Sequence, residues 1–529
     1  MDESLTYLDT YLLQKDMRIR LPKSVLENLN LEKVITKLNI YLDKNNKSLV
    51  LKKDFNKQEY LTQNDNSYND TQGERKVVKF VDLFAGIGGI RLGFEQAFNS
   101  HGFITKCVLT SEIKPHAIQA LNENFRQDNL RGDIHTVKSS EIEDFDFLLA
   151  GFPCQAFSFA GKGLGFSDTR GTLFFEVERI LRDKRPYGFI LENVEGLVLH
   201  DRENIGDKIG RTLTTILSKL SELNYNVEWK LLDCQIFGVP QIRKRIFIVG
   251  TQKTPVFLKD FEIINKVVGD ILEHGKPTIN SHFTKCLLNH YSPEQLYGKA
   301  IKDKRGGDIN IHSWDIGLKG DITDNQKKLI EKLFRERRKK HWADEIGIKW
   351  MDGMPLTLKQ ISTFCDEPNL KELLDDLVQK GYLVMEYPKA AINIQLEDGT
   401  IHEVREQDTT KELGYNIVAG KLSFEFTKIL DPNDISPTLV AADVSHIGVI
   451  DGNGIRKLTI REGLRLFGYP ESYNLSMFND DIGLAKAFDL LGNTVVVPAV
   501  KAVANKLCEA FITDNIKYNQ FNQKTNVLL

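Results

Sequence analysis

The pattern that most clearly suggests chemistry is a cysteine in a rigid turn after a buried strand. The motif Gly151-Phe152-Pro153-Cys154-Gln155 directly follows the apolar run 145–150. Such a run predicts a strand, and glycine and proline predict a turn at its end, so the Cys154 thiol is expected at the top of a sheet. A thiol in this position suits nucleophilic attack, whereas a buried structural cysteine, the commonest alternative, does not need the turn.

Three further predicted strands, 77–83, 105–111 and 189–194, end on or beside a polar or aromatic residue. These residues are Phe84, Glu112 and Glu192. Because an open parallel sheet binds its ligand at the carboxyl ends of the strands, all three are expected to line one cleft with Cys154. A buried glutamate opposite the thiol is a candidate general acid. Glu112 by itself is equally consistent with a helix-capping carboxylate before Pro115.

A glycine-rich turn, Phe84-Ala85-Gly86-Ile87-Gly88-Gly89, follows the strand 77–83 and precedes a predicted helix over 90–98. Strand, glycine turn and helix in this order form the first βα unit of a nucleotide-binding α/β domain. Gly86 and Gly88 are therefore candidate cofactor contacts. The predicted fold is α/β, with a doubly wound, Rossmann-like central sheet.

The overall composition excludes several classes of protein. The chain has 529 residues, with 70 basic and 73 acidic side chains, so nucleic acid could bind only through local patches. The six cysteines include no C-x-x-C pair, which predicts neither a metal site nor a disulfide framework. No long uncharged apolar segment and no N-terminal leader is present, so we expect a cytoplasmic protein without a membrane span.

Two basic segments are candidate ligand contacts. The loop 158–171 begins beside Cys154 and contains four glycines together with Lys162 and Arg170. Its glycines predict a lid whose cations close on phosphates, and a flexible surface loop is the alternative. Alternation along the extended segment before the strand 246–250 places Gln241, Arg243 and Arg245 on one face, where they could bind carbonyl and phosphate oxygens. A solvated charge run is the alternative there.

These motifs, in this order, resemble those of the DNA (cytosine-5) methyltransferases of bacterial restriction-modification systems. The resemblance covers about residues 77–251 and 430–510. It rests on the glycine-rich turn, the motif around Cys154, Glu192-Asn193-Val194, Gln241-x-Arg243-x-Arg245, the stretch from Arg456-Lys457-Leu458-Thr459 to Gly468-Tyr469-Pro470, and Gly492-Asn493-Thr494-Val495-Val496.

The resemblance implies S-adenosyl-methionine as methyl donor, with no metal. Phe84 would stack on the adenine, Glu112 would hold the ribose hydroxyls, Ile113 would pack on the base and Asp133 would contact the adenine amino group. Pro153, Leu173, Asn493 and Val495 would complete the pocket, with Val495 on a C-terminal helix that returns to the first domain.

The same resemblance implies a mechanism in which Cys154 attacks C6 of a cytosine flipped out of duplex DNA. Glu192 would protonate or hydrogen-bond N3, Arg245 would bind the O2 carbonyl, and Arg243 would support it. The side chains implied in DNA binding are Ser158, Lys162, Arg170, Gln241, Thr438 and Leu439.

Three parts of the chain are predicted. Residues 1–76 form an extension with a helix over 24–42 and a linker, although a regulatory or DNA-binding arm is an alternative. Residues 77–275 form the catalytic domain, which 485–515 complete. Residues 276–484 form a smaller target-recognition domain.

Inside the recognition domain, a basic helix over 325–342 is followed by helices over 357–364 and 370–380 and a strand over 382–387. This order is typical of a winged helix. A small α/β insert with a solvated basic helix is an equal alternative.

The predicted function is thus duplex DNA cytosine-5 methylation, with a cognate restriction endonuclease as a functional partner. Two rivals are an RNA methyltransferase with the same catalytic domain and a non-catalytic DNA-binding regulator. The long basic insert argues against the first, and the presence of Cys154, Glu192 and Arg245 argues against the second.

Overall fold

The computed structural model describes residues 38–43, 48–53, 76–125, 129–152, 173–204, 206–303, 310–350, 353–395, 401–418, 424–440, 444–479 and 481–526. The chain divides into two compact units, Met1–Glu74 and Arg75–Leu529.

The described part of the first unit is a β-hairpin. Strand β1 (Leu38–Asp43) pairs antiparallel with β2 (Ser48–Lys53). The helix predicted over 24–42 is therefore wrong for residues 38–42, and its other residues lie outside the described ranges. Leu38, Ile40 and Leu42 recur with a period of two, which fits a strand, while the four-residue interval between Leu38 and Leu42 also fits a helix. Pairing with β2 decides in favour of the strand.

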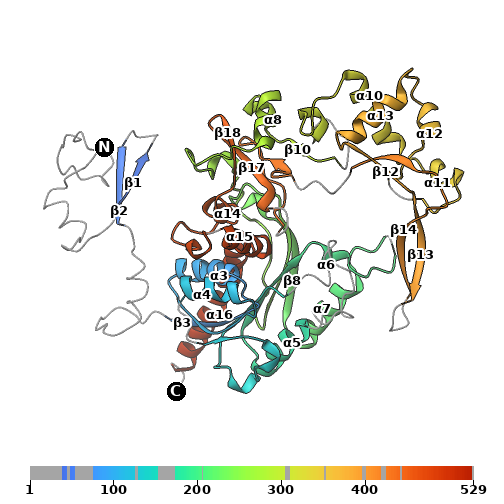
Figure 1. Cartoon of the computed structure of the whole chain (residues 1–529). Helices are drawn as coiled ribbons and strands as arrows, with labels where there is room; N and C mark the ends of the chain where they lie inside the picture. Colours follow the sequence, from blue (N-terminus) through green and yellow to red (C-terminus); the bar gives the residue numbers. More distant parts are fainter. Residues whose placement is uncertain are drawn as a thin grey trace. The chain divides into compact units, whose positions relative to one another are not determined.

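The second unit is organised around a seven-stranded sheet in the order β5-β4-β3-β6-β7-β9-β8 (Figure 1). Strands β3 to β7 run parallel, and β9 runs antiparallel to both of its neighbours, β7 and β8. The bounds are β3 Val77–Leu83, β4 Ile104–Ser111, β5 Leu130–Arg131, β6 Phe147–Ala150, β7 Gly188–Val194, β8 Asn226–Asp233 and β9 Lys244–Thr251. The predicted doubly wound α/β fold is confirmed, because the strand order reverses between β3 and β6.

Helices cover both faces of this sheet. Along β3 and β6, Phe80 and Phe147 pack in one core while Val81 and Leu148 pack in the other, as the two-residue period of a strand requires. The first core includes residues of α3 (Gly89–Ser100), α4 (Pro115–Asn124) and α16 (Val497–Asn526), and the second includes α5 (Leu173–Lys184) and α7 (Arg211–Glu222) (Figure 1).

The C-terminal helix α16 packs on the first helix of the sheet domain. A Cβ at Gly93 of α3 would come within 2.7 Å of Val500 and 2.8 Å of the Val497 carbonyl oxygen, so glycine permits the close approach. Phe511 of α16 also contacts Phe147 in the centre of the sheet, with ring centroids 5.3 Å apart. The layer that covers this face of the seven-stranded sheet is therefore built from segments far apart in the sequence.

A second sheet lies between the sheet domain and α16 in sequence. Its order is β11-β10-β16-β17-β18, with bounds β10 Ala300–Ile301, β11 Asn310–Ile311, β16 Lys428–Ile429, β17 Ile447–Asp451 and β18 Gly454–Lys457. Its core includes Phe283 of α8 (His282–His290) together with Phe426 and Ile455. The remaining α-helices of this unit outside the inserted subdomain are α6 Gly196–Leu199, α9 Pro293–Leu296, α14 Ile460–Leu466 and α15 Asp481–Asn493.

A helical subdomain is inserted between β11 and β16. Its elements are α10 Asp324–Glu336, α11 His341–Glu345, α12 Leu358–Ser362, α13 Leu370–Gln379, β12 Leu383–Glu386, β13 Lys389–Gln395, β14 Ile401–Gln407 and β15 Gly414–Ile417. The helices and strand predicted over 357–387 are present. The basic helix predicted over 325–342 ends earlier, at Glu336, because the Trp342 indole donates to the Glu336 carbonyl over 3.0 Å and caps the helix.

Candidate active site

The turn after β3 has the backbone that a close ligand approach requires. Phe84, Gly86 and Gly88 have φ values of 56°, 55° and 73°, in the left-handed region that favours glycine. A Cβ at Gly88 would come within 2.4 Å of Phe125, whereas a Cβ at Gly86 would meet nothing within 4 Å. Gly86 therefore faces open space at the carboxyl end of β3, where a ligand of this fold binds.

Glu112 joins this turn to the end of β4. Its Oε2 accepts a hydrogen bond from the Gly86 amide over 2.7 Å, and its Oε1 accepts from the amides of Ile113 and Lys114 over 2.8 Å each. A carboxylate offers about four acceptor positions, so one on Oε2 is left for a further donor. Glu112 thus anchors the backbone before α4, and its binding of the ribose stays a prediction.

The other predicted cofactor residues have different environments. Ile113 is 69% exposed at the same edge of the sheet. Asp133 accepts from the backbone amide and the ring of His135, and these bonds lower the pKa of Asp133. Leu173, the first residue of α5, is half-buried, and Asn493, the last residue of α15, is exposed and donates to Asp489 over 3.1 Å.

Val495 differs from its prediction. It lies in the three-residue link between α15 and α16, not in a helix. Its side chain is buried, and a Cβ at Gly89 would come within 2.8 Å of it, so Val495 packs against the start of α3. The link forms because Thr494, Val495 and Val496 are β-branched and Pro498 favours a new helix start.

Glu192, near the end of β7, and Arg245, near the start of β9, form an ion pair. Glu192 Oε1 lies 3.0 Å from Arg245 Nε, and both side chains are largely buried. Burial raises the pKa of Glu192, and the nearby Arg245 and Arg243 guanidinium groups offset only part of that rise. The direction of this shift favours the protonated form of the Glu192 carboxyl more than a carboxyl in water would.

The backbone leading to Cys154 lies beside this pair. A Cβ at Gly151 would be 3.6 Å from Glu192 Oε2, and the Asn193 side-chain amide donates to the Phe152 carbonyl over 3.2 Å. Cys154 follows within three residues. Pro153, Cys154, Ser158, Lys162 and Arg170 themselves lie outside the described residues.

Arg243 does not reach the cleft. It is 1% exposed and donates to the carbonyls of Leu439, Gly492 and Thr494 over 3.0, 3.1 and 2.6 Å. Its guanidinium also lies 5.1 Å from the centre of the Phe467 ring. Arg243 thus does bind carbonyl oxygens, as predicted, but these belong to two distant segments of the protein itself, at Leu439 and at 492–494. Arg243 supports the site by holding these segments together.

Two of the predicted DNA contacts are likewise buried. Gln241 has no exposed surface, donates to the Leu466 carbonyl over 3.1 Å and accepts from the Leu439 amide, so a direct DNA contact is wrong for it. Leu439 is 1% exposed, which excludes a side-chain contact. Thr438 is exposed and donates to the Ile242 carbonyl over 2.6 Å. Gln241 and Arg243 do share one face of the extended segment, as predicted, but the alternation of side chains does not show which face other parts of the protein bury.

Two tyrosines outside the predicted set support the glycine-rich turn. Tyr473 donates to the Ile87 carbonyl over 2.6 Å, and the Tyr469 hydroxyl bonds the Thr494 hydroxyl over 2.6 Å. A Cβ at Gly89 would come within 2.6 Å of that Tyr469 hydroxyl. The only signal in the sequence was the position of Tyr469 in one of the motifs quoted for the resemblance.

The described residues lack both a cluster of metal-ligating side chains and a helix that could span a membrane. They contain no group of three or more His, Cys, Asp or Glu side chains arranged to hold a metal ion. Within the same ranges, no helix is both long enough and apolar enough to cross a membrane.

Comparison with known families decides the identity of this fold. The model of the C-5 cytosine-specific DNA methylase family matches residues 78–509. The chain belongs to this family. The predicted enzyme class, an S-adenosyl-methionine-dependent DNA cytosine-5 methyltransferase, is thereby confirmed.

This methylase matches several curated relatives over nearly their whole length. The Type II methyltransferase M.NlaIV of Neisseria lactamica is 55% identical over 430 residues, which are 81% of this chain and 98% of the relative. M.NgoBV of Neisseria gonorrhoeae is 54% identical with the same coverage. M.BanI of Aneurinibacillus aneurinilyticus is 42% identical over 81% of this chain and 95% of its own length.

Proposed function

We propose that this methylase transfers a methyl group from S-adenosyl-methionine to C5 of cytosine in a specific duplex sequence, and so protects DNA in a Type II restriction-modification system. The names of the relatives support the system, and a cognate endonuclease would then be a functional partner. One observation carries the chemistry: the Glu192–Arg245 pair lies beside the backbone that leads to Cys154.

The residues at the carboxyl ends of β3 and β4 fit S-adenosyl-methionine. Open space at Gly86 admits the cofactor close to the backbone, and the remaining acceptor position of Glu112 suits a ribose hydroxyl. Phe84 follows β3, Ile113 follows β4 and Asp133 follows β5, and the three would surround the adenine. The bound cofactor supplies a methyl group on a sulfonium, which is an electrophile.

The reaction begins at Cys154. Its thiolate adds to cytosine C6 while the Glu192 carboxyl gives a proton to N3, so the negative charge does not accumulate on the ring. Arg245 binds the O2 carbonyl oxygen and stabilises the same charge. The resulting enamine carbon C5 then takes the methyl group.

Elimination restores the aromatic ring. A base removes the C5 proton, the electrons of that bond form the C5–C6 double bond, and Cys154 leaves C6 as the thiolate. N3 returns its proton to the Glu192 carboxylate, which leaves neutral 5-methylcytosine. Because C6 is hidden in stacked DNA, the cytosine must first be flipped out at a cost of a few kcal/mol. Ser158, Lys162, Arg170 and Thr438 are the proposed contacts that offset this cost.

The proposed division of labour follows the chain. Residues 77–275 and 485–515 carry out methyl transfer, and 276–484 select the DNA sequence. Residues 1–76 are an extension that includes the described hairpin of β1 and β2.

Bisulfite sequencing of DNA from cells expressing the chain tests the proposal, with Cys154→Ser as the control. We expect 5-methylcytosine at one recurring sequence with the unaltered chain and none with the variant. Transfer assays on duplex DNA and on transfer RNA distinguish the RNA-modifying rival. Methylation of transfer RNA alone, or full activity of Cys154→Ser, would refute the proposal.

A further inference from the structure

The inserted subdomain has its own core and a recognisable order of elements. Helix α10 is followed by the short helix α11, by Leu356, which forms an isolated bridge with Tyr415, and then by α12, α13, β12 and β15, where β12 and β15 pair antiparallel. Apart from α11, and with the bridge at Leu356 in place of the first strand, this is the order of a winged helix, with the hairpin β13–β14 lengthening the wing (Figure 1). Its core includes Leu333 of α10, Leu374 and Leu377 of α13, and Tyr415 of β15.

One face of α10 carries cations without partners. Lys328, Lys332 and Arg335 are exposed and recur at intervals of four and three residues, which places them on one side of the helix. Within the described ranges, these three side chains form no salt bridge or hydrogen bond. The opposite side of α10, which includes Leu329 and Leu333, is buried in the core.

Most neighbouring cations of the subdomain are paired. Lys327 bonds Asp315 over 2.8 Å, Lys371 bonds Asp375 over 2.5 Å and Lys380 bonds Asp376 over 2.7 Å. Two exposed acids of α10, Asp324 and Glu331, lie beside the row, and neither forms a salt bridge or hydrogen bond within the described ranges. The row extends about 10 Å along the helix axis, at 1.5 Å per residue, so it can meet successive phosphates of one strand.

Helix α13, the second helix of the pair α12–α13, carries mainly negative charge. The exposed or half-exposed ionisable residues of α13 are Lys371, Glu372, Asp375 and Asp376. Glu372 has no partner in the described part of the chain, and Asp375 accepts from Tyr415 and Lys371. In many helix-turn-helix proteins this helix enters the major groove. Here its carboxylates would approach the phosphates that flank the groove.

We propose that the subdomain binds duplex DNA through the phosphate backbone against Lys328, Lys332 and Arg335 of α10, and that α13 faces away from the duplex. The inference rests on the proposed function only in taking duplex DNA as the substrate. It assigns to α10 a sequence-independent, electrostatic share of the affinity.

The test compares Lys328→Gln/Lys332→Gln with a matched control, Lys253→Gln/Lys259→Gln. The control lysines are exposed and follow β9, whose last residue, Thr251, pairs with Gly188 at the first residue of β7, the end opposite the cleft. Equilibrium binding to a methylatable duplex is measured from about 50 to 200 mM salt. We expect the α10 variant to make the fall of log affinity with log salt less steep by about 2. The affinity ratio of the unaltered chain to the variant should then shrink about tenfold between the lowest and the highest salt. The control should leave the slope unchanged.

Glu372→Gln tests the orientation of α13. If α13 faces away from DNA, Glu372→Gln binds the duplex as tightly as the unaltered chain does. If α13 lies in the groove, Glu372→Gln binds the duplex more tightly, because the variant loses a negative charge near the phosphates. An unchanged slope for the α10 variant, or tighter binding by Glu372→Gln, would overturn the proposal. Methyl transfer at saturating duplex, measured on the same samples, tests the proposed function separately.

Discussion

Arg456 offers the sharpest test of what ties the chain at 273–276 to the chain at 451–462. Arg456 is 2% exposed, and its guanidinium donates to Asp451 over 2.8 Å, to the two carboxylate oxygens of Glu462 over 2.9 and 2.7 Å, and to the Glu273 carbonyl over 2.6 Å. Asp451 also accepts from the amides of Gly275 and Lys276. The chain leaving the sheet domain at 273–276 is thereby tied to the chain returning at 451–462.

The expected cost of Arg456→Met follows from burial. The variant keeps the bulk of the side chain but leaves Asp451 and Glu462 as buried acids without their cation, and Glu462 has no exposed surface. Breaking a buried pair in this way costs about 3–5 kcal/mol of unfolding free energy. Arg456→Met/Asp451→Asn/Glu462→Gln removes the stranded charges and should recover part of this loss.

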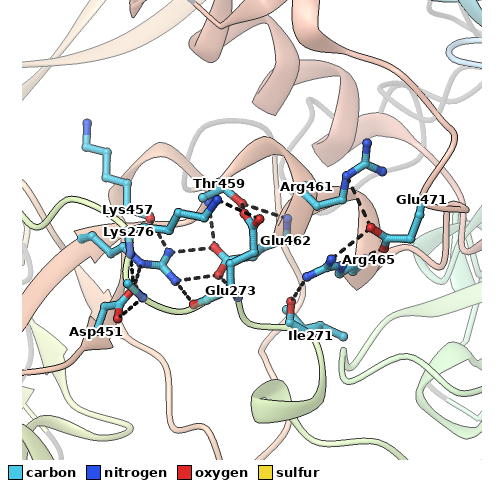
Figure 2. A network of polar contacts seen from close by, with 12 residues as sticks. Ile271, Glu273, Lys276, Asp451, Lys457, Thr459, Arg461, Glu462, Arg465 and Glu471 are labelled. Atoms are coloured by element: carbon cyan, nitrogen blue, oxygen red, sulfur yellow. Dashed lines mark hydrogen bonds and ion pairs between the residues drawn. The ribbon is translucent and has the colours of Figure 1, made fainter. Parts of the chain in front are cut away.

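Arg465→Met is the matched control. Arg465 bonds Glu471 over 2.7 Å in the same network, but the Glu471 side chain is 64% exposed, so we expect a cost of about 1 kcal/mol or less (Figure 2). Urea unfolding followed by circular dichroism and by tryptophan fluorescence measures both variants. A cost of about 1 kcal/mol or less for Arg456→Met would refute the reasoning, because that is the value of a surface pair.

The pH dependence of the same network is a second prediction. Burial raises the pKa of Asp451, but hydrogen bonds from Arg456, Lys276 and Gly275 outweigh burial and lower this pKa to about 2. The contribution of Asp451 to the free energy of unfolding, measured by urea titration, should therefore persist above about pH 4 and disappear between about pH 4 and 2. Third, Glu192→Gln should lower kcat by about 100-fold or more and remove the alkaline limb that Glu192 imposes on kcat, because only the protonated carboxyl can donate to N3; an unchanged pH profile would exclude Glu192 as the acid. Fourth, Arg243→Lys should leave at least one of three buried carbonyls without its donor and cost about 2 kcal/mol of stability, while any enzyme that remains folded keeps its KM for DNA; a raised KM with normal stability would mean that Arg243 contacts the substrate. Fifth, Glu112→Ala should raise the KM for S-adenosyl-methionine by about tenfold or more, and binding by calorimetry should show the same change.

The sheet domain was predictable because its signals are local. Apolar runs that end at Phe84, Glu112 and Glu192 mark strands, and turns rich in glycine or proline mark where the strands end. Each signal lies within a few residues of the element that it specifies. The parallel pairing of β3, β4, β6 and β7 then brings their ends to one edge, so the cleft followed from the strands.

The environments of Gln241 and Arg243 were not predictable in this way. Alternation in an extended segment specifies which residues share a face, but their partners, Leu439, Leu466 and Thr494, come from segments about 200 to 250 residues away. The hairpin β1–β2 was missed for a related reason, since Leu38 to Leu42 fit both periods until the partner strand is known. Long-range contacts decided each case.

The packing of α16 on α3 also sets an order of events during synthesis. The inner surface of α16 covers Phe98 and Phe147, yet about 400 residues separate it from α3. A bacterial ribosome adds about 5–20 residues per second, so this apolar surface waits roughly 20–80 s for its cover. During that interval the nascent chain is a natural client for a chaperone. The sheet domain cannot be complete until α16 has left the ribosome.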